Sequence, residues 1–328
     1  MNPSLLYRHQ WNATDLLAEH PPRFSCERKR RGFELARPSA APPSGRVSVS
    51  RWQAEELPGQ VDVDAALRQL EVRPGYFTYD PSPAGRVDWH VNFAHLDAFA
   101  FYGTSLFAQD EWQVAEHPLL ACVREALLSR PTQLLTLEDD RATPLLVWGA
   151  ERWCAIATDA DASAGRPNGL YGQEFGRASL EAIERAVHQL ATRTETHVIA
   201  IAAPSYGEGA YRLHELREIL ATAYAGFRAA VIESEIQRGR ADSVCIHTGF
   251  WGCGAFGGNR IVMTALQVLA VGMAGATSLV FHHGSAAGRD DVEGAVALLC
   301  ELSGEESAEG LLRGIQSRCF EWGVSNGT

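Results

Sequence analysis

The sequence lacks paired cysteines and long apolar runs, and each absence excludes a class of protein. Its seven cysteines are scattered and odd in number, with no C-x-x-C pair. This argues against a zinc site or a disulfide scaffold and fits a reducing, cytoplasmic location. No apolar run approaches the roughly 20 residues that cross a bilayer, and the first residues are too polar for a signal peptide. We therefore expect no membrane association, no metal and no cofactor.

Positive charge is also scarce. The chain has 29 Lys and Arg residues against 40 Asp and Glu residues, a formal net charge of −11. Non-specific nucleic-acid binding depends on positive charge. Direct nucleic-acid binding is therefore not expected, and any polyanionic ligand must be held locally. The 328 residues suffice for two domains, or for one large α/β domain with an extension.

A glycine-rich stretch is the strongest local signal. Val244 to His247 is a short apolar run typical of a buried strand, five glycines follow from Gly249 to Gly258, and a helical pattern begins at Ile261. A strand that runs through such a loop into a helix can hold a phosphate on backbone N–H groups. The stretch is neither a Walker motif nor G-x-G-x-x-G, and an ordinary βα turn stays open. Trp251 and Phe256 suggest that something flat or apolar lies beside the anion.

The rest of the chain alternates strands and helices. Strands are expected at 87–94, 145–148, 153–157, 197–202 and 277–282, and helices at 61–70, 108–128, 179–190, 211–237 and 292–302. Pro118 predicts a break in the second helix. Residues 1–50 are expected to be irregular, with a Pro/Ser linker from Pro38 to Gly45. The basic run from Arg28 to Arg31 is interpreted as solvated surface. This order predicts an α/β sandwich with a mixed or mostly parallel sheet.

An acidic pair is the second stretch with chemical content. Gln109, Asp110 and Glu111 stand at the start of the helix expected from residue 108. Acids favour the first turn because they complement the helix dipole, so a structural explanation stays open.

The register of two long motifs points to a family. The sequence from Val91 to Glu111 resembles V-D-F-A-N, a glycine loop and Q-E-E, and T-G-F-W-G-C-G-A-F-G-G from Thr248 resembles T-G-x-W-G-C-G-A-F-G-G. Both patterns belong to poly(ADP-ribose) glycohydrolases, and shorter blocks follow that family's order across roughly residues 87–284. The chain is identified by this resemblance as a divergent member of the family.

The resemblance implies a fold, a reaction and a set of residues. It implies a macrodomain-like three-layer sandwich over 61–328, a mixed sheet flanked by helices, with an N-terminal extension over 1–60 that packs on it. The implied reaction cleaves an O-glycosidic ribose bond of poly- or mono-ADP-ribose conjugates, with Glu111 as general acid and Asp110 on ribose hydroxyls. The partner is ADP-ribose or an ADP-ribosylated macromolecule. The implied ligand-binding residues are Gln109, Asn92, Tyr171, Thr248, Gly249, Trp251, Gly252, Cys253, Gly254, Ala255 and Phe256.

Departures from the pattern keep two alternatives open. The catalytic-loop glycines are replaced by Phe99, Ala100 and Phe101, whose side chains are expected to block or reshape the approach to the diphosphate. The family's acid in V-D-F-A-N is Asn92 here. A non-catalytic module that binds ADP-ribose or a related nucleotide therefore remains possible, as does a scaffold whose pocket is filled.

Two further chemistries are considered. Cys253, at the start of the expected helix, is a conceivable nucleophile. Adjacent His282 and His283 could bind metal, but neighbours at a strand end point in opposite directions, so pocket or core histidines are expected, and His283 could stack on adenine.

Overall fold

The computed structural model describes residues 3–37, 42–54, 56–204, 207–239 and 243–325. Its centre is an eight-stranded sheet in the order β1-β2-β7-β8-β4-β9-β10-β3. Neighbours from β1 to β8 in this order are antiparallel and those from β8 to β3 are parallel, so the sheet is mixed, as predicted. The strand bounds are β1 Ser4–Asn12, β2 Arg46–Gln53, β3 Leu70–Arg73, β4 Arg86–Phe93, β7 Leu145–Ile156, β8 Val187–Ile201, β9 Ser243–Thr248 and β10 Ser278–His282; β5 (Leu137–Glu138) and β6 (Arg141–Ala142) form a separate pair.

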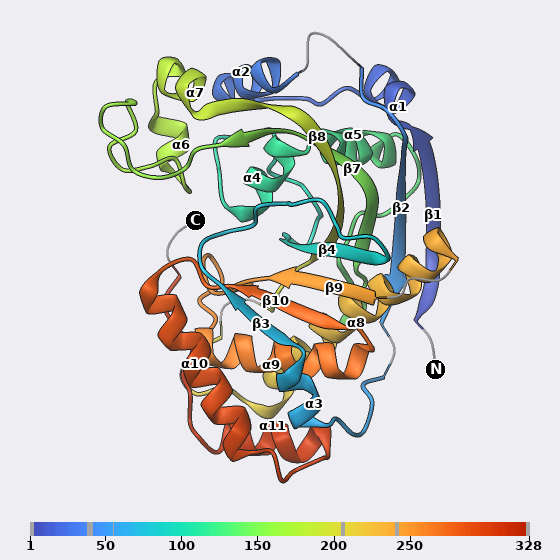
Figure 1. Cartoon of the computed structure of the whole chain (residues 1–328), viewed down its shortest axis with the longest axis vertical. Coiled ribbons are helices and arrows are strands. Elements are labelled where there is room, and N and C mark those ends of the chain that lie inside the picture. Colours follow the sequence, from blue (N-terminus) through green and yellow to red (C-terminus); the bar gives the residue numbers. More distant parts are fainter. Residues whose placement is uncertain (1–2, 38–41, 55, 205–206, 240–242, 326–328) are drawn as a thin grey trace.

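Helices cover both faces of the sheet and complete a three-layer α/β sandwich (Figure 1). One layer contains α3, α8, α9, α10 and α11 around the largest core cluster, and the other contains α1, α2, α4, α5, α6 and α7. The helix bounds are α1 Ala13–Glu19, α2 Glu27–Ala36, α3 Val63–Arg68, α4 Gln109–Glu116, α5 Leu119–Leu128, α6 Glu174–Arg177, α7 Leu180–Ala186, α8 Leu213–Arg238, α9 Arg260–Ala274, α10 Ala286–Glu301 and α11 Ala308–Gln316.

Local patterns predicted the elements around the site. Val87, Trp89 and Val91 alternate along β4 and are buried together in the largest core cluster. Pro118 separates α4 from α5, as predicted, because proline cannot donate the helical hydrogen bond. The strand, glycine-rich loop and helix from β9 to α9 also lie where the sequence placed them.

The prediction of an irregular N-terminal segment is wrong. β1 pairs with β2, and β2 pairs with β7, so these residues form the antiparallel edge of the central sheet. Lys29 on α2 is 4% exposed, which corrects the interpretation of the basic run as solvated surface at that position, whereas Arg30 is exposed as expected. Residues 38–41 of the expected linker lie outside the described residues. The boundary proposed near residue 60 stays a prediction.

Two predictions in the middle of the chain differ from the structure. The strands expected at 145–148 and 153–157 are one strand, β7, whose pairing with β8 shifts register between Val147 and Ala150. The helix expected over 179–190 ends at Ala186, and the chain continues directly into β8. Ser179 caps that helix as predicted, because its side chain accepts from Ala182 N–H. Sheet pairing, which periodicity cannot show, decided both cases. β3 and α11 were not predicted.

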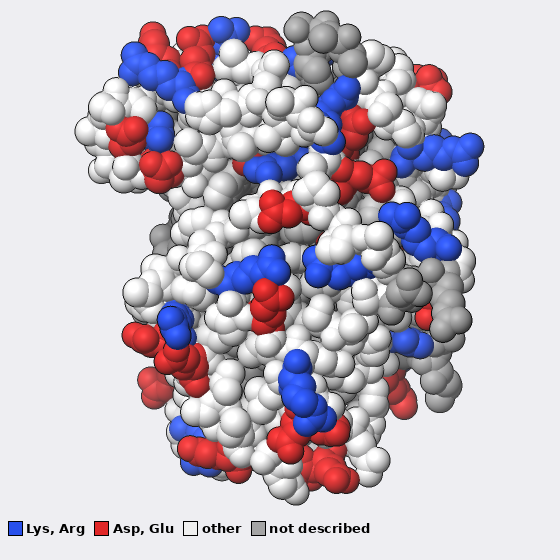
Figure 2. Space-filling view, viewed as in Figure 1, with Lys and Arg blue, Asp and Glu red and all other residues white. Residues whose placement is uncertain are grey.

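The surface gives no sign of a broad cationic patch on the face shown in Figure 2, where basic and acidic side chains are interspersed. None of the described helices combines the length and apolarity needed to cross a bilayer.

Candidate active site

The glycine-rich loop between β9 and α9 is closed by its own backbone. Trp251 N–H donates to Gly249 O at 2.7 Å, and Gly258 N–H donates to Gly252 O at 2.9 Å. Gly252 has a φ of +75°, and a Cβ there would lie 2.5 Å from the Cβ of Ala203. Only glycine fits this position, so the glycines fix the path of a loop that exposes backbone to the space beside it.

The N-terminus of α9 is capped by its own side chain. Asn259 Oδ1 accepts from Ile261 N–H at 3.1 Å and from Val262 N–H at 3.3 Å. Part of the positive helix end is therefore already satisfied within the protein. Arg260, the first residue of α9, lines the adjacent cavity, and its guanidinium also lies 3.2 Å from Asp291 Oδ2, so an anion in the cavity would share this positive charge with that carboxylate.

The ring of Trp251 does not provide the ligand-facing surface that the sequence suggested. Its side chain is fully buried in the core, and Nε1 donates to Ile201 O at 3.0 Å. Trp251 therefore fixes the loop onto β8 by packing and by one hydrogen bond. Phe256 is half-buried and does line the cavity.

A cavity of about 320 Å³ opens beside this loop. Of the expected ligand-binding residues, Gln109, Tyr171, Gly249 and residues 251–256 line it. The start of α4, the loop after β10 and the segment after β3 supply the other walls. Its volume is within the range of small-molecule sites, so the structure brings the glycine-rich loop and the start of α4 together around one space.

Four expected site residues do not line this cavity in the described structure: Asn92, Asp110, Glu111 and Thr248. Thr248 is buried, and its hydroxyl donates to Gln267 Oε1 at 2.5 Å. Its observed contact therefore supports the start of the glycine-rich loop from behind.

The acidic pair is buried at the N-terminus of α4. Glu111 Oε2 accepts from Ala108 N–H at 2.9 Å, so this carboxylate caps its own helix. Asp110 Oδ1 accepts from Asn92 Nδ2 at 3.0 Å. Burial, and then the nearby charge of Glu111, raise the pKa of Asp110. The raised pKa favours the protonated form of Asp110.

Tyr171 lies against the first turn of α4, next to the acidic pair. Its phenol oxygen accepts from the Gln109 backbone N–H, and the nearby charge of Glu111 adds to the burial that raises the Tyr171 pKa to about 12. Its side chain is 42% exposed, on the cavity wall. Tyr171 therefore lies between the cavity and the first turn of α4.

Phe99 and Phe101 do not line the cavity, so the expected block is absent, while the expectation that they reshape the approach to the diphosphate stays a prediction. Phe99 is fully buried in the core cluster on the α5 side of the sheet, with a φ of +60°. Phe101 is 38% exposed, and its ring lies 5.0 Å from that of His95. The loop therefore places both rings outside the cavity lining.

Lys29 is a residue near the site that sequence reasoning missed. It is the only lysine in the sequence, and its Nζ donates to Tyr102 O at 3.2 Å and lies 4.8 Å from the Phe107 ring centre. Burial lowers its pKa to about 8, against the opposing charges of Glu111 and then Asp110. A lone lysine in an arginine-rich chain was the available signal.

Aromatic cavity residues were also missed. Tyr76 and Phe77 follow β3, and Trp112 lies on α4; the ring centres of Tyr76 and Trp112 are 5.7 Å apart. Their clustering depends on β3, which the sequence did not predict.

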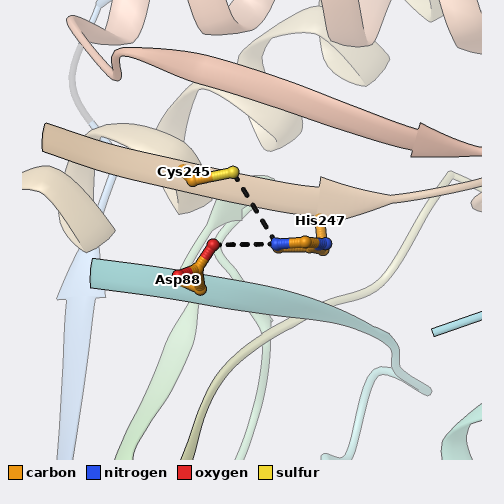
Figure 3. A group of neighbouring side chains, drawn as sticks. All are labelled: Asp88, Cys245 and His247. Atoms are coloured by element: carbon orange, nitrogen blue, oxygen red, sulfur yellow. Dashed lines mark hydrogen bonds and ion pairs between the residues drawn. The ribbon is translucent and has the colours of Figure 1, made fainter. Parts of the chain in front are cut away.

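A set of potential metal ligands lies apart from the acidic pair. Asp88, Cys245 and His247 are buried and have donor atoms within 4.8 Å of one another (Figure 3). Arg86 lies 2.9 Å from Asp88 Oδ1, and His247 Nε2 lies 2.9 Å from the same oxygen. Positive charge and hydrogen bonds already satisfy this carboxylate, so we assign no metal to the group.

The structure does not support Cys253 as a nucleophile. Burial raises the pKa of its thiol, which opposes formation of the reactive thiolate. It also precedes α9 by several residues, so the helix N-terminus does not act on it directly.

Part of the chain matches a known protein family, and most of the chain is similar to solved structures. The family model described as "Poly (ADP-ribose) glycohydrolase (PARG), Macro domain fold" matches residues 134–288. This segment contains the glycine-rich loop but not the acidic pair. Among solved structures, the chain is similar to a poly(ADP-ribose) glycohydrolase from Thermomonospora curvata bound to the inhibitor ADP-HPD, at 14% identity over 87% of this chain and 98% of that one, with a TM-score of 0.43. It is also similar to a poly(ADP-ribose) glycohydrolase from Deinococcus radiodurans in complex with ADP-ribose, at 14% identity over 90% and 94%, with a TM-score of 0.40.

Proposed function

Because the chain is a divergent member of the poly(ADP-ribose) glycohydrolase-type macrodomain family, we propose that its cavity binds ADP-ribose and cleaves the O-glycosidic ribose bond of an ADP-ribose conjugate. The observation that carries this proposal is one cavity bounded by both the glycine-rich loop and the start of α4. The first wall suits a diphosphate, and the second adjoins two carboxyl groups.

The diphosphate would lie against the loop. Gly254 and Ala255 line the cavity, and backbone N–H groups in such a loop hold anions. Arg260 adds a positive side chain on the same wall. In a protein with a net charge of −11, this local supply is what an anionic ligand requires.

The acidic pair would perform the bond cleavage. The leaving oxygen needs a proton, and the oxocarbenium-like state that follows needs nearby negative charge. We assign the proton donor to Glu111 and contacts with ribose hydroxyls to Asp110. Tyr171 lies against the turn that carries both acids. Because neither acid lines the cavity, this turn or Tyr171 would shift when a ribose binds.

A second function is binding without cleavage. Glu111 Oε2 is engaged by Ala108 N–H and does not line the cavity. If that hydrogen bond persists when ligand is bound, it holds the carboxyl group in the helix cap and away from the cavity wall. The protein would then recognise ADP-ribose or a related nucleotide and leave it intact.

Calorimetry with ADP-ribose tests binding. We expect the unmodified protein to bind, and Gly254→Val to abolish binding because the added side chain enters the loop wall. Gly304→Val is the matched control, since a Cβ at Gly304 meets nothing within 4 Å. Absence of binding heat with the unmodified protein would refute the proposed ligand.

Product release then separates the two functions. Poly- and mono-ADP-ribosylated substrates are incubated with the protein, and free ADP-ribose is measured. We expect release by the unmodified protein and its loss in Glu111→Gln, with ADP-ribose binding retained. Binding by both proteins with release by neither would establish the non-catalytic function.

A further inference from the structure

A chain of three polar side chains crosses the sheet toward the ligand cavity. Asp88 lies on β4, His247 on the neighbouring β9 and His282 at the end of β10, next to β9. His247 Nε2 is 2.9 Å from Asp88 Oδ1, and His247 Nδ1 is 3.2 Å from His282 Nε2. Figure 3 shows the His247 ring directed at Asp88 from the neighbouring strand. All three side chains are buried, and His282 lines the cavity.

Asp88, the member of this group farthest from the cavity, determines which atoms donate and which accept along it. Burial alone would raise the pKa of Asp88, but hydrogen bonds from His247, Ser82 and Arg86 outweigh burial and hold that pKa well below its usual range. An ionised carboxylate only accepts hydrogen bonds. His247 must therefore donate through Nε2, and in a neutral imidazole its Nδ1 then accepts.

The role of His247 Nδ1 as acceptor also determines the roles of the two ring nitrogens of His282. With His247 in that neutral form, His282 Nε2 donates to His247 Nδ1, and His282 Nδ1 keeps a free lone pair. Burial is the largest cause that lowers the pKa of His282 to about 4, so the ring is neutral at physiological pH. The three residues thus present a hydrogen-bond acceptor at the cavity.

That acceptor is unsatisfied within the described residues. His282 Nδ1 is buried and makes no hydrogen bond of ordinary geometry there, although the Tyr76 backbone lies close enough to the ring to act on its pKa. The centre of the Phe77 ring lies 5.1 Å from that of His282, at 85°, and Phe93 also lines the cavity. Buried polar atoms are normally paired, so an unpaired acceptor between aromatic rings marks a position that a ligand donor would complete.

We propose that His282 is a specificity-determining residue that accepts a hydrogen bond from a neutral O–H or N–H donor of the bound ligand through Nδ1, and that His247 and Asp88 are positioning residues that set its ring and tautomer. This inference rests on the proposed binding of ADP-ribose in the cavity. The donor is either the amino group of the base or a ribose hydroxyl, since the diphosphate has no donor near neutral pH.

Calorimetry with His282→Phe tests the contact, because phenylalanine keeps a planar ring and removes both nitrogens. The net worth of one hydrogen bond corresponds to a loss of about tenfold in ADP-ribose affinity. His282→Asn, which retains an acceptor near the position of Nδ1, should recover part of that loss. Thermal unfolding of each variant checks that it is folded.

Ligand analogues identify the donor. The hypoxanthine analogue of ADP-ribose lacks the base amine, ADP lacks the terminal ribose, and the 2′,3′-dideoxyadenosine analogue lacks the hydroxyls of the other ribose. The affinity difference between the unmodified protein and His282→Phe should vanish for the one analogue that lacks the contacted donor. An equal loss for all four ligands would show a packing effect and overturn the inference.

The positioning role has a spectroscopic readout. Nitrogen-15 NMR should show His282 protonated on Nε2 and not on Nδ1 in the unmodified protein, and this preference should weaken in His247→Ala and in Asp88→Asn. Equal ADP-ribose affinity of unmodified protein and His282→Phe would overturn this inference and leave the proposed function intact. No ADP-ribose binding by the unmodified protein would overturn both.

Discussion

Asn92 Nδ2 donates a 3.0 Å hydrogen bond to Asp110 Oδ1 and thereby joins the end of β4 to the first turn of α4. The related motif has an acid at the position of Asn92, which would place a third carboxyl group beside Asp110 and Glu111. An amide supplies a donor instead and reduces the repulsion within a buried site.

Asp110 should make stability fall with rising pH. Its pKa is raised in the folded protein, so the folded state keeps a proton that the unfolded chain has released. Its contribution is fully present below the unfolded pKa of about 4 and is lost as pH rises through the higher folded pKa. Asp110→Asn should remove this loss, so its unfolding free energy should gain most over the unmodified protein at pH 9.

Urea unfolding at pH 5, 7 and 9 measures this effect. Asp290→Asn, which replaces an exposed acid, is the control and should leave the pH dependence unchanged. If the unfolding free energy of Asp110→Asn exceeded that of the unmodified protein most at pH 5, the assigned direction of the pKa shift would be wrong.

Lys29 should offset the charge of the acidic pair. Lys29→Met keeps an apolar side chain and removes a buried cation. Burial lowers the pKa of this cation to about 8, and the charges of Glu111 and then Asp110 oppose that lowering. Burial outweighs this attraction, but the attraction should grow as the acids ionise, so the loss of stability on removing the cation should grow with it. Urea unfolding should therefore show a greater loss at pH 8 than at pH 5, whereas an equal loss at both would indicate packing alone.

His117 should contribute to acid unfolding. Its Nδ1 lies 2.8 Å from Gln113 O and its Nε2 lies 3.0 Å from Thr196 Oγ1. Burial, and then Arg152, lower its pKa from 6.5 to about 3, so below pH 6.5 the unfolded chain takes up a proton that the folded protein does not. This group alone should remove about 1.4 kcal/mol of unfolding free energy per pH unit between those values.

His117→Gln should flatten that dependence. The variant loses stability at pH 7, where the native contacts are complete, but its decline from pH 7 to pH 5 should be shallower. Denaturant midpoints at the two pH values measure the slope. A decline as steep as that of the unmodified protein would place the acid sensitivity elsewhere.

Gly149 should be essential where the pairing of β7 with β8 shifts register, between Val147 and Ala150. It has a φ of +82°, and a Cβ there would lie 2.4 Å from Arg46 O on β2. Gly149→Ala should therefore destabilise the protein by at least about 2 kcal/mol. Gly45→Ala is a matched control, because Gly45 also has positive φ but open space around it. Equal midpoints for both variants in denaturant would show that the steric contact is unimportant.

Sequence reasoning succeeded where neighbours along the chain decide structure. The alternation at Val87, Trp89 and Val91 predicted β4, and the break at Pro118 predicted two helices. It failed at Gly149, which looked like a turn between two strands. Pairing with β2 and β8 carries the strand through that position, and those partners are remote in sequence.

The sequence by itself determined the alternation of strands and helices, the glycine-rich loop after β9 and the neighbouring acids at the start of α4, because backbone preference and apolar periodicity act over a few residues. Only the tertiary structure decided that Phe99 turns into the core, that Lys29 approaches the acidic pair and that Asp88, His247 and His282 align across three strands. Those outcomes depend on sheet register and on burial, which bring together charges and rings separated by up to about two hundred residues.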